Sequence, residues 1–461
     1  MSEQSQAFLE SAEVKTFDAE HRRKLAFNIS QYDKKVEEGK HQYADLEIAR
    51  QRASSRKWKA IENLDKYLEE FESVFTRRGG KVIWARDAEE ALNEVIAIMK
   101  KSGARTVVKS KSMTTEEIHL NEALEKESIE SIETDLGEFI VQLRKEHPYH
   151  IVTPAMHLSK EDVAKTFHEK YDLPIESTPK EITAFVRARL REKYQSADVG
   201  ITGANFIIAD TGAVAVTENE GNAVMTVAFP KIHIAIAGIE KIIPSLKDLD
   251  LFWPLLATHG TGQNITVYNS ILTGPRQPSE IDGPDEMYVI LLDNGRTNLL
   301  AEQEQRQALS CIRCGACLNG CPIYKGVGGH SYGSTYSGPI GSVITPHYKG
   351  MEEFKHLSFA SSLCGKCTEV CPVKIDLHKL LLYNRRDAVE QGLAASSEKI
   401  AYVFWKKAML NRKIMNKGGA KAKNFVLKNF FKKQWGERRE MPQVAAKSFN
   451  ELWKGKSKAL K

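Results

Sequence analysis

The run CIRCGACLNGCP, Cys311–Pro322, and its shorter counterpart SSLCGKCTEVCP, residues 361–372, contain all seven cysteines of the chain. The first run has the spacing C-x2-C-x2-C-x3-C-P, which is typical of proteins that hold two iron–sulfur clusters, and in which the cysteine before the proline ligates the other cluster. Each proline ends its helical turn and directs that cysteine outward. We therefore predict cluster 1 on Cys311, Cys314, Cys317 and Cys371, and cluster 2 on Cys321, Cys364 and Cys367.

The second run lacks its first cysteine, because Ser361 stands at that position. Cluster 2 is then either a three-iron cluster or a four-iron cluster whose fourth iron binds Ser361, water or a group from a partner. Oxygen ligation or an open iron would change the potential and the stability of the cluster.

Zinc and disulfides are the alternatives for these cysteines. C-x2-C pairs also occur in zinc ribbons and fingers, but no histidine lies at finger spacing here. The odd number of cysteines disfavours a disulfide framework. The spacing therefore favours iron–sulfur clusters and electron transfer.

The composition is that of an ordinary globular chain, with 461 residues, 42% hydrophobic and 27% charged. This length suggests two to three domains. The polar, acidic start and the absence of a long apolar run predict neither a signal peptide nor a membrane span. We therefore expect a reducing cytoplasmic location, which suits thiolate ligands.

The secondary-structure pattern of the first 300 residues changes near residue 80. Residues 7–74 are rich in helix formers and free of proline, and we predict helix there. Strand-like and helix-like stretches then alternate, which predicts an open parallel sheet with helices on both faces. The predicted strands are 81–85, 104–110, 128–132, 150–156, 206–210, 213–217, 223–227 and 232–237, and the predicted helices between the first of them are 87–103 and 113–128.

Glycine-rich turns at Gly200, Gly203 and Gly212 suit either tight turns or a cradle for a phosphate or acyl group, and tight turns are favoured because no G-x-G-x-x-G or Walker motif is present. Residues 258–276 and 286–300 add strands and turns, and a helix over 299–311 leads to the first cysteine. Residues 326–350 are predicted as a long irregular connection, which is either a plain linker or, as we favour, lies over a cluster and donates N–H bonds to it. Residues 375–392 are predicted as an amphipathic helix.

The C-terminal part is strongly basic. Residues 401–461 contain 17 Lys and Arg against 3 Glu, a net charge of +14, so that the preceding 400 residues carry −8. Aromatic residues lie among these lysines. We predict a helical extension that docks on the chain's own acidic body or on an acidic protein partner, with an anionic membrane surface second and nucleic acid last.

Several stretches together resemble a known family. ADVGITGANFIIADTGAVAV (197–216), with SIETDLGEFIVQL (131–143) and HIVTPAMHL (150–158), resembles the lactate-utilisation (LUD) domain. The two cysteine runs, with GPIGSVITP (338–346) between them, resemble the two-cluster ferredoxin segment of the same family, and the tail resembles its C-terminal extension. The chain is identified as a member of the lactate utilisation protein B family over nearly its whole length.

This resemblance implies an α/β LUD domain related to the NagB/ribose-5-phosphate isomerase and CoA-transferase fold, with a helical N-terminal arm, an α-helical ferredoxin-type two-cluster domain and a basic helical C-terminal extension. The domain ranges are 1–75 for the arm, 76–300 for the LUD domain, 301–395 for the cluster domain and 396–461 for the extension. It also implies the same seven cysteine ligands for two clusters, a second run with three cysteines, and companion proteins A and C in the oxidation of L-lactate to pyruvate.

Two hypotheses follow for the chemistry. In the first, the chain is the electron-transfer subunit, the hydride step occurs elsewhere because no flavin fingerprint is present, and the electron acceptor is unknown. In the second, the LUD domain itself catalyses or binds an acyl group while the clusters are structural or regulatory. If this chain binds lactate, a carboxylate anchor and a base are required, and the candidates are Lys109, Lys111, His157, Asp210 and His233.

Overall fold

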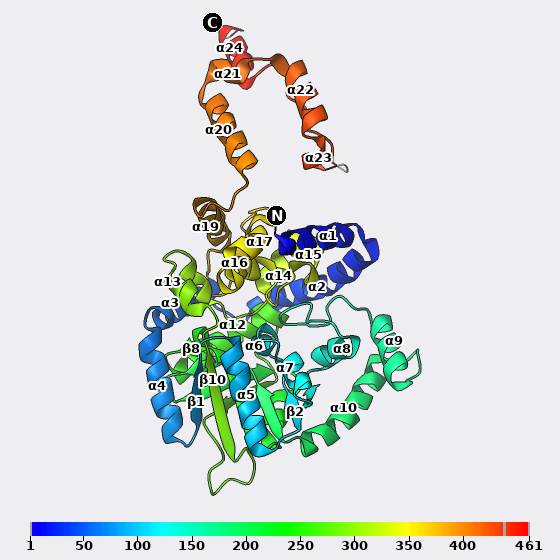
Figure 1. Ribbon diagram of the computed structural model, residues 1–461, viewed down its shortest axis with the longest axis vertical. Helices are drawn as coiled ribbons and strands as arrows, with labels where there is room; N and C mark the ends of the chain where they lie inside the picture. The colour runs from blue at the N-terminus through cyan, green and yellow to red at the C-terminus, as the bar shows by residue number, and fades with distance from the viewer. Residues whose placement is uncertain (1, 437–438, 460–461) are drawn as a thin grey trace. The chain divides into compact units, whose positions relative to one another are not determined.

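A parallel sheet lies at the centre of the larger part of the protein (Figure 1). The computed structural model describes residues 2–436 and 439–459, and the chain divides into two units, Met1–Ala388 and Val389–Lys461. Six strands of the first unit pair in the order β1-β10-β7-β4-β2-β3, all parallel. These strands are β1 (Lys81–Ala85), β2 (Thr106–Lys109), β3 (Glu130–Glu133), β4 (Val199–Thr202), β7 (Ile232–Gly238) and β10 (Glu286–Leu292).

The strand β7 shows why the sheet is covered on both faces. Ile234 and Ile236 pack in one hydrophobic cluster with α5 (Ala88–Ser102), while Ala235 and Ala237 pack in the cluster on the opposite face. Successive strand residues point to opposite faces, so a run that is apolar at every position, such as residues 234–237, is buried on both sides. A third cluster joins β2 and β3 to α8 (Leu136–Arg144), α9 (Lys160–Tyr171) and α10 (Pro179–Ser196). The predicted parallel α/β sheet is confirmed.

A second, mixed sheet packs beside the first and was not predicted. Its order is β8-β5-β6-β9, formed by β5 (Phe206–Ile208), β6 (Ala213–Glu218), β8 (Ile242–Ile243) and β9 (Tyr268–Leu272). The strand predicted over 223–227 is wrong, because α11 (Asn222–Ala228) occupies it. The Glu218 carboxylate accepts the free N–H groups of Ala223 and Val224, at 2.7 and 2.9 Å, and so caps this helix. The helix α12 (Leu249–Thr261) lies between β8 and β9 in the sequence.

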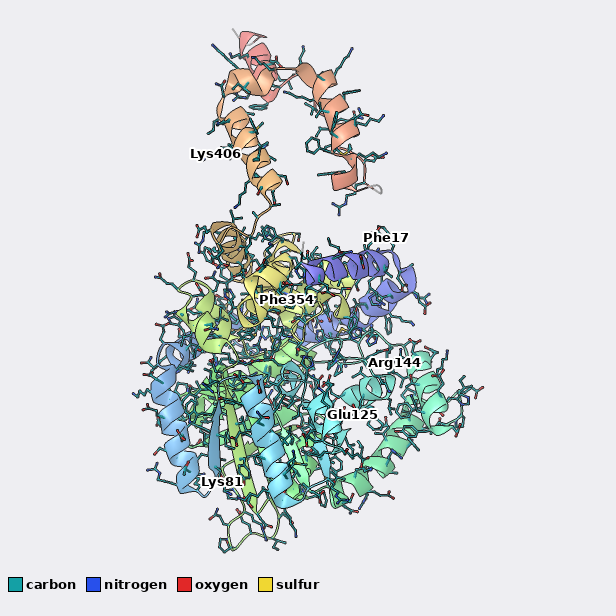
Figure 2. All side chains as sticks on the ribbon, in the orientation of Figure 1. Phe17, Lys81, Glu125, Arg144, Phe354 and Lys406 are labelled. Carbon is teal, nitrogen blue, oxygen red and sulfur yellow. The ribbon has the colours of Figure 1, made fainter. Side chains whose placement is uncertain are left out.

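The N-terminal helical prediction is confirmed as four helices rather than one. They are α1 (Glu3–Phe17), α2 (Ala19–Lys40), α3 (Leu46–Glu62) and α4 (Leu64–Arg77). Asp18 and Asp45 accept N–H groups of the following helices and thereby mark two of the breaks. Figure 2 shows how side chains fill the space between these helices, the sheet and the cysteine segment.

The cysteine segment consists of short helices joined by irregular turns at residues 311–315 and 361–364. It contains α14 (Ala316–Gly320), α15 (Pro322–Val327), α16 (Gly338–Lys349), α17 (Met351–Phe359), α18 (Lys366–Glu369) and α19 (Leu377–Glu390). The irregular connection predicted over 326–350 is therefore wrong in its second half, where α16 lies. Pro346 cannot donate to the Ser342 carbonyl, and the Ser358 hydroxyl donates to that oxygen instead, at 2.7 Å. The predicted helix over 375–392 is confirmed as α19.

Three further predictions need correction. Residues 150–156 form turns and no strand, because the Lys111 ammonium takes two of their carbonyls and His150 accepts the N–H groups of Val152 and Thr153. The helix predicted over 113–128 is two helices, α6 (Met113–Glu117) and α7 (Leu120–Lys126), divided at His119, whose φ is 55°. The helix predicted over 299–311 is α13 (Arg296–Ala301) followed by the 3-10 helix η3 (Gln305–Ser310).

The second unit consists of short helices, as predicted for the basic extension. They are α20 (Ser396–Leu410), α21 (Arg412–Asn416), α22 (Gly419–Phe430), α23 (Lys432–Trp435) and α24 (Phe449–Ala459). The extension predicted over 396–461 includes residues 437–438 and 460–461, and the arm predicted over 1–75 includes residue 1; these lie outside the described residues. Within the described parts of the chain, no helix has the length and apolarity needed to cross a membrane.

Candidate iron–sulfur centre

The two cysteine runs fold into the same turn, 50 residues apart in the sequence. Gly315 and Gly365 both have φ of 80° and ψ of −7°, and each begins a short helix that carries the next cysteine. The residues two positions earlier, Arg313 and Leu363, also have positive φ, at 61° and 53°. Non-glycine residues rarely adopt this conformation. The repeat therefore reflects a shared local structure that brings cysteine side chains to one side of the turn.

Four cysteines surround one small cavity beside the LUD part of the chain. Cys311, Cys314, Cys317 and Cys371 line it together with apolar side chains. Burial and the neighbouring Cys371 and Cys311 thiols raise the pKa of Cys314, and burial likewise raises the pKa of Cys371 to about 12. Thiols in such surroundings become thiolates by exchanging a proton for a metal. The donor set thus fits a cluster with four thiolate ligands.

The other three cysteines form a second, more open group. The short helices α14 and α18, which precede Cys321 and carry Cys367, pack against each other. Burial, and then the Cys321 and Cys364 thiols, raise the pKa of Cys367 to about 11. Cys367 is 8% exposed, whereas Cys364 lies at the surface. This group fits a second cluster that reaches solvent.

A buried charge network joins the first cysteine turn to the sheet. The Arg296 guanidinium donates twice to the Glu117 carboxylate, at 2.8 Å each, and once to Glu240, at 2.5 Å. Arg313, inside the first cysteine run, contacts Glu240 at 3.4 Å, and the Tyr336 hydroxyl donates to Glu117 at 2.6 Å. Both arginines are buried, and such a network is costly to break at any one member.

Two buried lysines add positive charge near Cys311. The Lys57 ammonium donates to the carbonyls of Glu240 and Ile242, at 2.6 and 3.2 Å. Burial lowers the pKa of Lys57 to about 7 and that of Lys241 to about 8, although Glu240 opposes both shifts. With Arg313, these cations make the surroundings of the first group electropositive, which is one of the means by which a protein tunes a cluster potential.

The sequence prediction missed this network. Arg313 carried a signal, because a cation within a cysteine run is unlikely to face only solvent. Lys57 lies on α3 of the N-terminal arm, so no local pattern connects it with Cys311.

The first helices also hold the second cysteine run. The Arg50 guanidinium donates to the carbonyl oxygens of Cys371, at 2.9 Å, and Glu369, at 2.7 Å. Glu47 forms an ion pair with Lys374. The prolyl end of this run is therefore fixed by α3.

A separate cavity of about 330 Å³ lies between the LUD part and the cysteine segment. Its polar lining is rich in cationic and titratable groups, namely Glu116, His119, Lys145, Glu146, His147, His330, Ser334, Thr335 and Lys349. Both acids have partners: Glu116 contacts Lys109 at 3.5 Å, and Glu146 contacts His157 at 2.8 Å. The other charged side chains of the lining are Lys145 and Lys349, which could pair with a small anion, and we call this space the cationic cavity after them.

Two candidate residues on or after β2 are buried and engaged. The Lys109 ammonium lies 2.6 Å from the Glu133 carboxylate and 3.0 Å from the Thr115 hydroxyl. Burial acts to lower the pKa of Lys109, but Glu133 and Glu116 outweigh it and hold that pKa above its usual value. The Lys111 ammonium donates to the carbonyls of Ile151 and Val152, at 2.7 Å each, and burial lowers its pKa.

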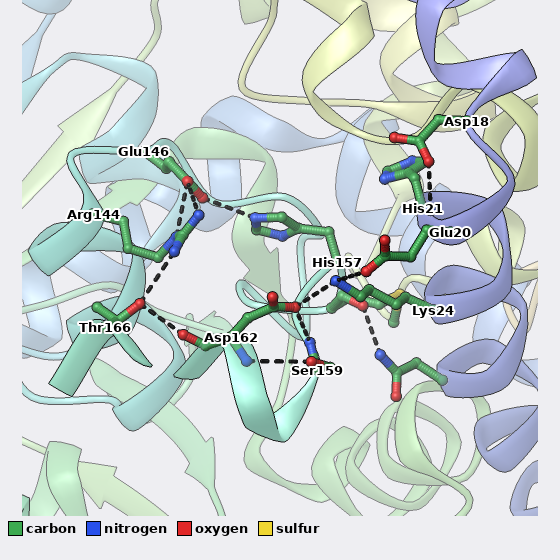
Figure 3. A network of polar contacts seen from close by, with 12 residues as sticks. Asp18, Glu20, His21, Lys24, Arg144, Glu146, His157, Ser159, Asp162 and Thr166 are labelled. Atoms are coloured by element: carbon green, nitrogen blue, oxygen red, sulfur yellow. Dashed lines mark hydrogen bonds and ion pairs between the residues drawn. The ribbon is translucent and has the colours of Figure 1, made fainter. Parts of the chain in front are cut away.

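The other candidates lie apart from one another. His157 Nε2 faces Glu146 at 2.8 Å within a polar network that also includes Arg144 (Figure 3). His233 is buried on β7, where its Nε2 lies 2.9 Å from the Thr202 hydroxyl and burial lowers its pKa to about 3. Asp210 is at the surface, where it accepts the N–H of Leu246 at 3.0 Å. None of the five candidates lines the cationic cavity, but Lys109 and His157 each contact an acid that does.

Comparisons with known proteins agree with this division of the chain. The LUD domain family matches residues 68–292, and the 4Fe-4S dicluster domain family matches residues 307–375. Lactate utilization protein B of Bacillus cytotoxicus is 44% identical over 406 residues, which cover 86% of this chain and 85% of that protein. The chain belongs to the lactate utilization protein B family.

Other relatives support the same assignment. Lactate utilization protein B of Bacillus subtilis is 46% identical over 367 residues, covering 77% of this chain and 76% of that protein. The Escherichia coli protein named "Uncharacterized electron transport protein YkgF" is 42% identical over 415 residues, covering 88% and 87%. A crystal structure of a DUF162 family protein from Deinococcus radiodurans aligns with 50% of this chain and 98% of its own chain, at 14% identity and with a TM-score of 0.29.

As a lactate utilization protein B family member with a 4Fe-4S dicluster domain, the chain carries iron–sulfur clusters, as its cysteine spacing predicted. The two groups of cysteines described above are the thiols of that domain. The assignment of each cysteine to one cluster, and the domain boundaries, stay predictions.

Proposed function

We propose that this chain is the iron–sulfur electron-transfer component of a multi-protein system that oxidises L-lactate to pyruvate and so allows growth on lactate. The observation that carries the proposal is the repeated cysteine turn. One set of cysteines is buried against the LUD part, and the other reaches solvent at Cys364. The names of the relatives, which include lactate utilization and electron transport, support it.

The stoichiometry of the reaction suits two clusters. Lactate gives pyruvate, two protons and two electrons, and each cluster accepts one electron, so the pair takes up the electrons of one turnover. We propose Cys311, Cys314, Cys317 and Cys371 as the ligands of cluster 1, and Cys321, Cys364 and Cys367 as cysteine ligands of cluster 2. Electrons then enter at the buried cluster beside the electropositive network and leave through the exposed one.

The partners in this proposal are the companion lactate utilisation proteins A and C, one of which performs the hydride step, and an acceptor near Cys364. A reducing cytoplasm suits such exposed thiolates. The helices α20 and α22 carry lysines such as Lys406 beside aromatic residues (Figure 2), and we propose that they bind an acidic surface of a partner protein. Cosedimentation with anionic lipid vesicles but not with the companions would instead indicate a peripheral membrane contact.

Anaerobic mixing tests the electron-transfer role. The purified chain is incubated with L-lactate, with and without proteins A and C, while cluster absorbance and pyruvate are measured; D-lactate is the matched control substrate. We expect bleaching of the clusters and pyruvate formation only with the companions and L-lactate. Lactate oxidation by the companions at an unchanged rate, with this chain absent or replaced by Cys314→Ser, would contradict the role.

The second candidate function makes the LUD part the substrate-binding module. The cationic cavity favours it, because Lys145 and Lys349 could pair with a small carboxylate while the Ser334 and Thr335 hydroxyls donate hydrogen bonds. Titration calorimetry with L-lactate checks this, comparing Lys349→Met with the surface control Lys170→Met. Binding that is lost only in Lys349→Met, together with reduction of the clusters by lactate in the chain alone, would favour this candidate over the first.

A further inference from the structure

The second cysteine turn places a serine where the first has its leading cysteine. We propose that the Ser361 hydroxyl oxygen is the fourth protein ligand of cluster 2, which makes it a four-iron cluster with three thiolates and one alkoxide. This inference rests on the cluster 2 ligands proposed above and does not depend on the lactate reaction.

The backbone carries the first part of the argument. The two turns match residue by residue at an offset of 50, with Cys314 and Cys364 each between a residue of positive φ and a glycine of φ 80°. The same offset relates Cys311 to Ser361. Since the turn directs Cys311 into the cavity that it shares with Cys314, the matching turn directs Ser361 toward the side of Cys364.

The side chains carry the second part. The N–H of Arg313 donates to the sulfur of Cys311, at 3.4 Å, and the N–H of Leu363 donates to the hydroxyl oxygen of Ser361, at 3.1 Å. The serine oxygen therefore occupies the position of the cysteine sulfur relative to its own turn, and it accepts the same backbone bond. Such N–H bonds to a ligand atom favour its anionic form.

Ser361 is also held in place from outside the turn. The Arg385 guanidinium, on α19, donates to the carbonyl oxygens of Ser358 at 2.9 Å and Ser361 at 3.1 Å. It also lies over the Phe359 ring, 5.2 Å from its centroid. These contacts fix the segment of chain that leads into the second turn, so the serine is positioned before any metal binds.

The coordination step is balanced by one proton. As the bond between iron and the Ser361 oxygen forms, the hydroxyl proton passes to water, for which the exposed Cys364 marks a route. An alkoxide is a harder donor than a thiolate and favours the more oxidised iron. Cluster 2 would then have a lower potential than the all-thiolate cluster 1, so that transfer from cluster 1 to cluster 2 is the uphill step of the relay and is driven by the acceptor near Cys364.

Iron analysis and EPR on the anaerobically purified full chain test the ligand. The variants are Ser361→Ala, Ser361→Cys and the control Ser362→Ala, since Ser362 is the neighbouring hydroxyl beside the Cys364 thiol. Wild type and the control should hold about eight irons and show no oxidised three-iron signal. Ser361→Ala should hold about seven irons and show a sharp oxidised signal near a g value of roughly 2.

Three outcomes would overturn the proposal. Ser361→Ala with eight irons and wild-type spectra would assign the fourth position to water or another group, and a wild type with seven irons would leave cluster 2 without a fourth ligand. If Ser361→Ala does not fold, Mössbauer spectra decide: Ser361→Cys should replace one oxygen-ligated iron site by a thiolate-type site, and unchanged spectra refute the ligand. If the clusters load normally but are not reduced by lactate in the presence of the companions, the proposed function is refuted and the Ser361 ligand is not.

Discussion

Replacement of Arg296 tests the buried network that joins the sheet to the first cysteine turn. Arg296→Met removes three charged hydrogen bonds and leaves two buried carboxylates, Glu117 and Glu240, without their main partner. Breaking a buried ion pair on one side costs about 3–5 kcal/mol. Glu240 keeps Arg313 and Glu117 keeps the Tyr336 hydroxyl, so we expect a loss of about 4 kcal/mol rather than a sum over both pairs.

The pH dependence of stability shows whether the unpaired carboxylates cause the loss in Arg296→Met. In the wild type, Arg296 holds the pKa of Glu117 below its usual value against the opposing effect of burial, and the pKa of Glu240 is about 2. Both groups are thus ionised at neutral pH, and their contribution to stability is lost only as pH falls from the usual glutamate range toward these low values. In the variant, burial dominates and raises the pKa of at least one carboxyl, so the folded form gains stability as pH falls.

The assay is scanning calorimetry of cluster-loaded protein at one fixed scan rate, between about pH 8 and about pH 6. Arg276→Met is the control, since its ion pair with Asp285 is exposed and should be worth at most about 1 kcal/mol. We expect the free energy of unfolding of Arg296→Met to lie below that of the wild type, and this difference to narrow toward low pH by at most about 1.4 kcal/mol per pH unit. A deficit that stays constant or widens would refute the reasoning.

Three further predictions concern the core, a close approach and the charge near Cys311. Phe71→Ala, at a position with 0% exposure, should cost about 3–5 kcal/mol, while Phe404→Ala, at 67% exposure, should change stability by less than about 0.5 kcal/mol in the same melts. Gly341→Ala should reduce cluster content and stability because its added methyl would lie 1.8 Å from a backbone oxygen, whereas Gly326→Ala, with nothing within 4 Å, should load iron normally. Lys57→Met should lower the midpoint potential of one cluster in an EPR-monitored redox titration at about pH 6, below the Lys57 pKa of about 7, because a buried protonated amine stabilises the added electron; an unchanged potential would count against the role of this lysine.

The sequence allowed the parallel sheet and the cysteine turns to be predicted because their signals are local. Apolar runs such as 232–237 suit a strand buried on both faces, and the spacing of the cysteines reflects one turn of backbone. The errors arose where a side chain from outside the segment decides its local structure. Residues 223–227 have strand-forming composition, but the Glu218 carboxylate caps a helix there, and Lys111 takes the carbonyls of the turn at 150–156.

The same contrast between local signals and contacts from elsewhere in the chain holds for the candidate site. The thiols could be predicted from spacing alone, whereas the cationic cavity joins residues near 116, 146, 330 and 349, which no local pattern connects. The five residues proposed for catalysis were chosen by residue type. Type does not reveal that the Lys111 ammonium is engaged by backbone carbonyls or that burial keeps His233 neutral.

The contacts of the first helices have a consequence for how this protein is made. The Ser2 hydroxyl donates to a carbonyl 351 residues later, and the Arg50 guanidinium reaches the Cys371 carbonyl across 321 residues. During synthesis α1 leaves the ribosome long before α15 and α17, on which it packs, and such distant contacts form slowly. The helices α2, α3 and α4 can pack earlier, on α12, β8 and β1. Packing of α1 on the cysteine segment is therefore a late step in the assembly of this protein.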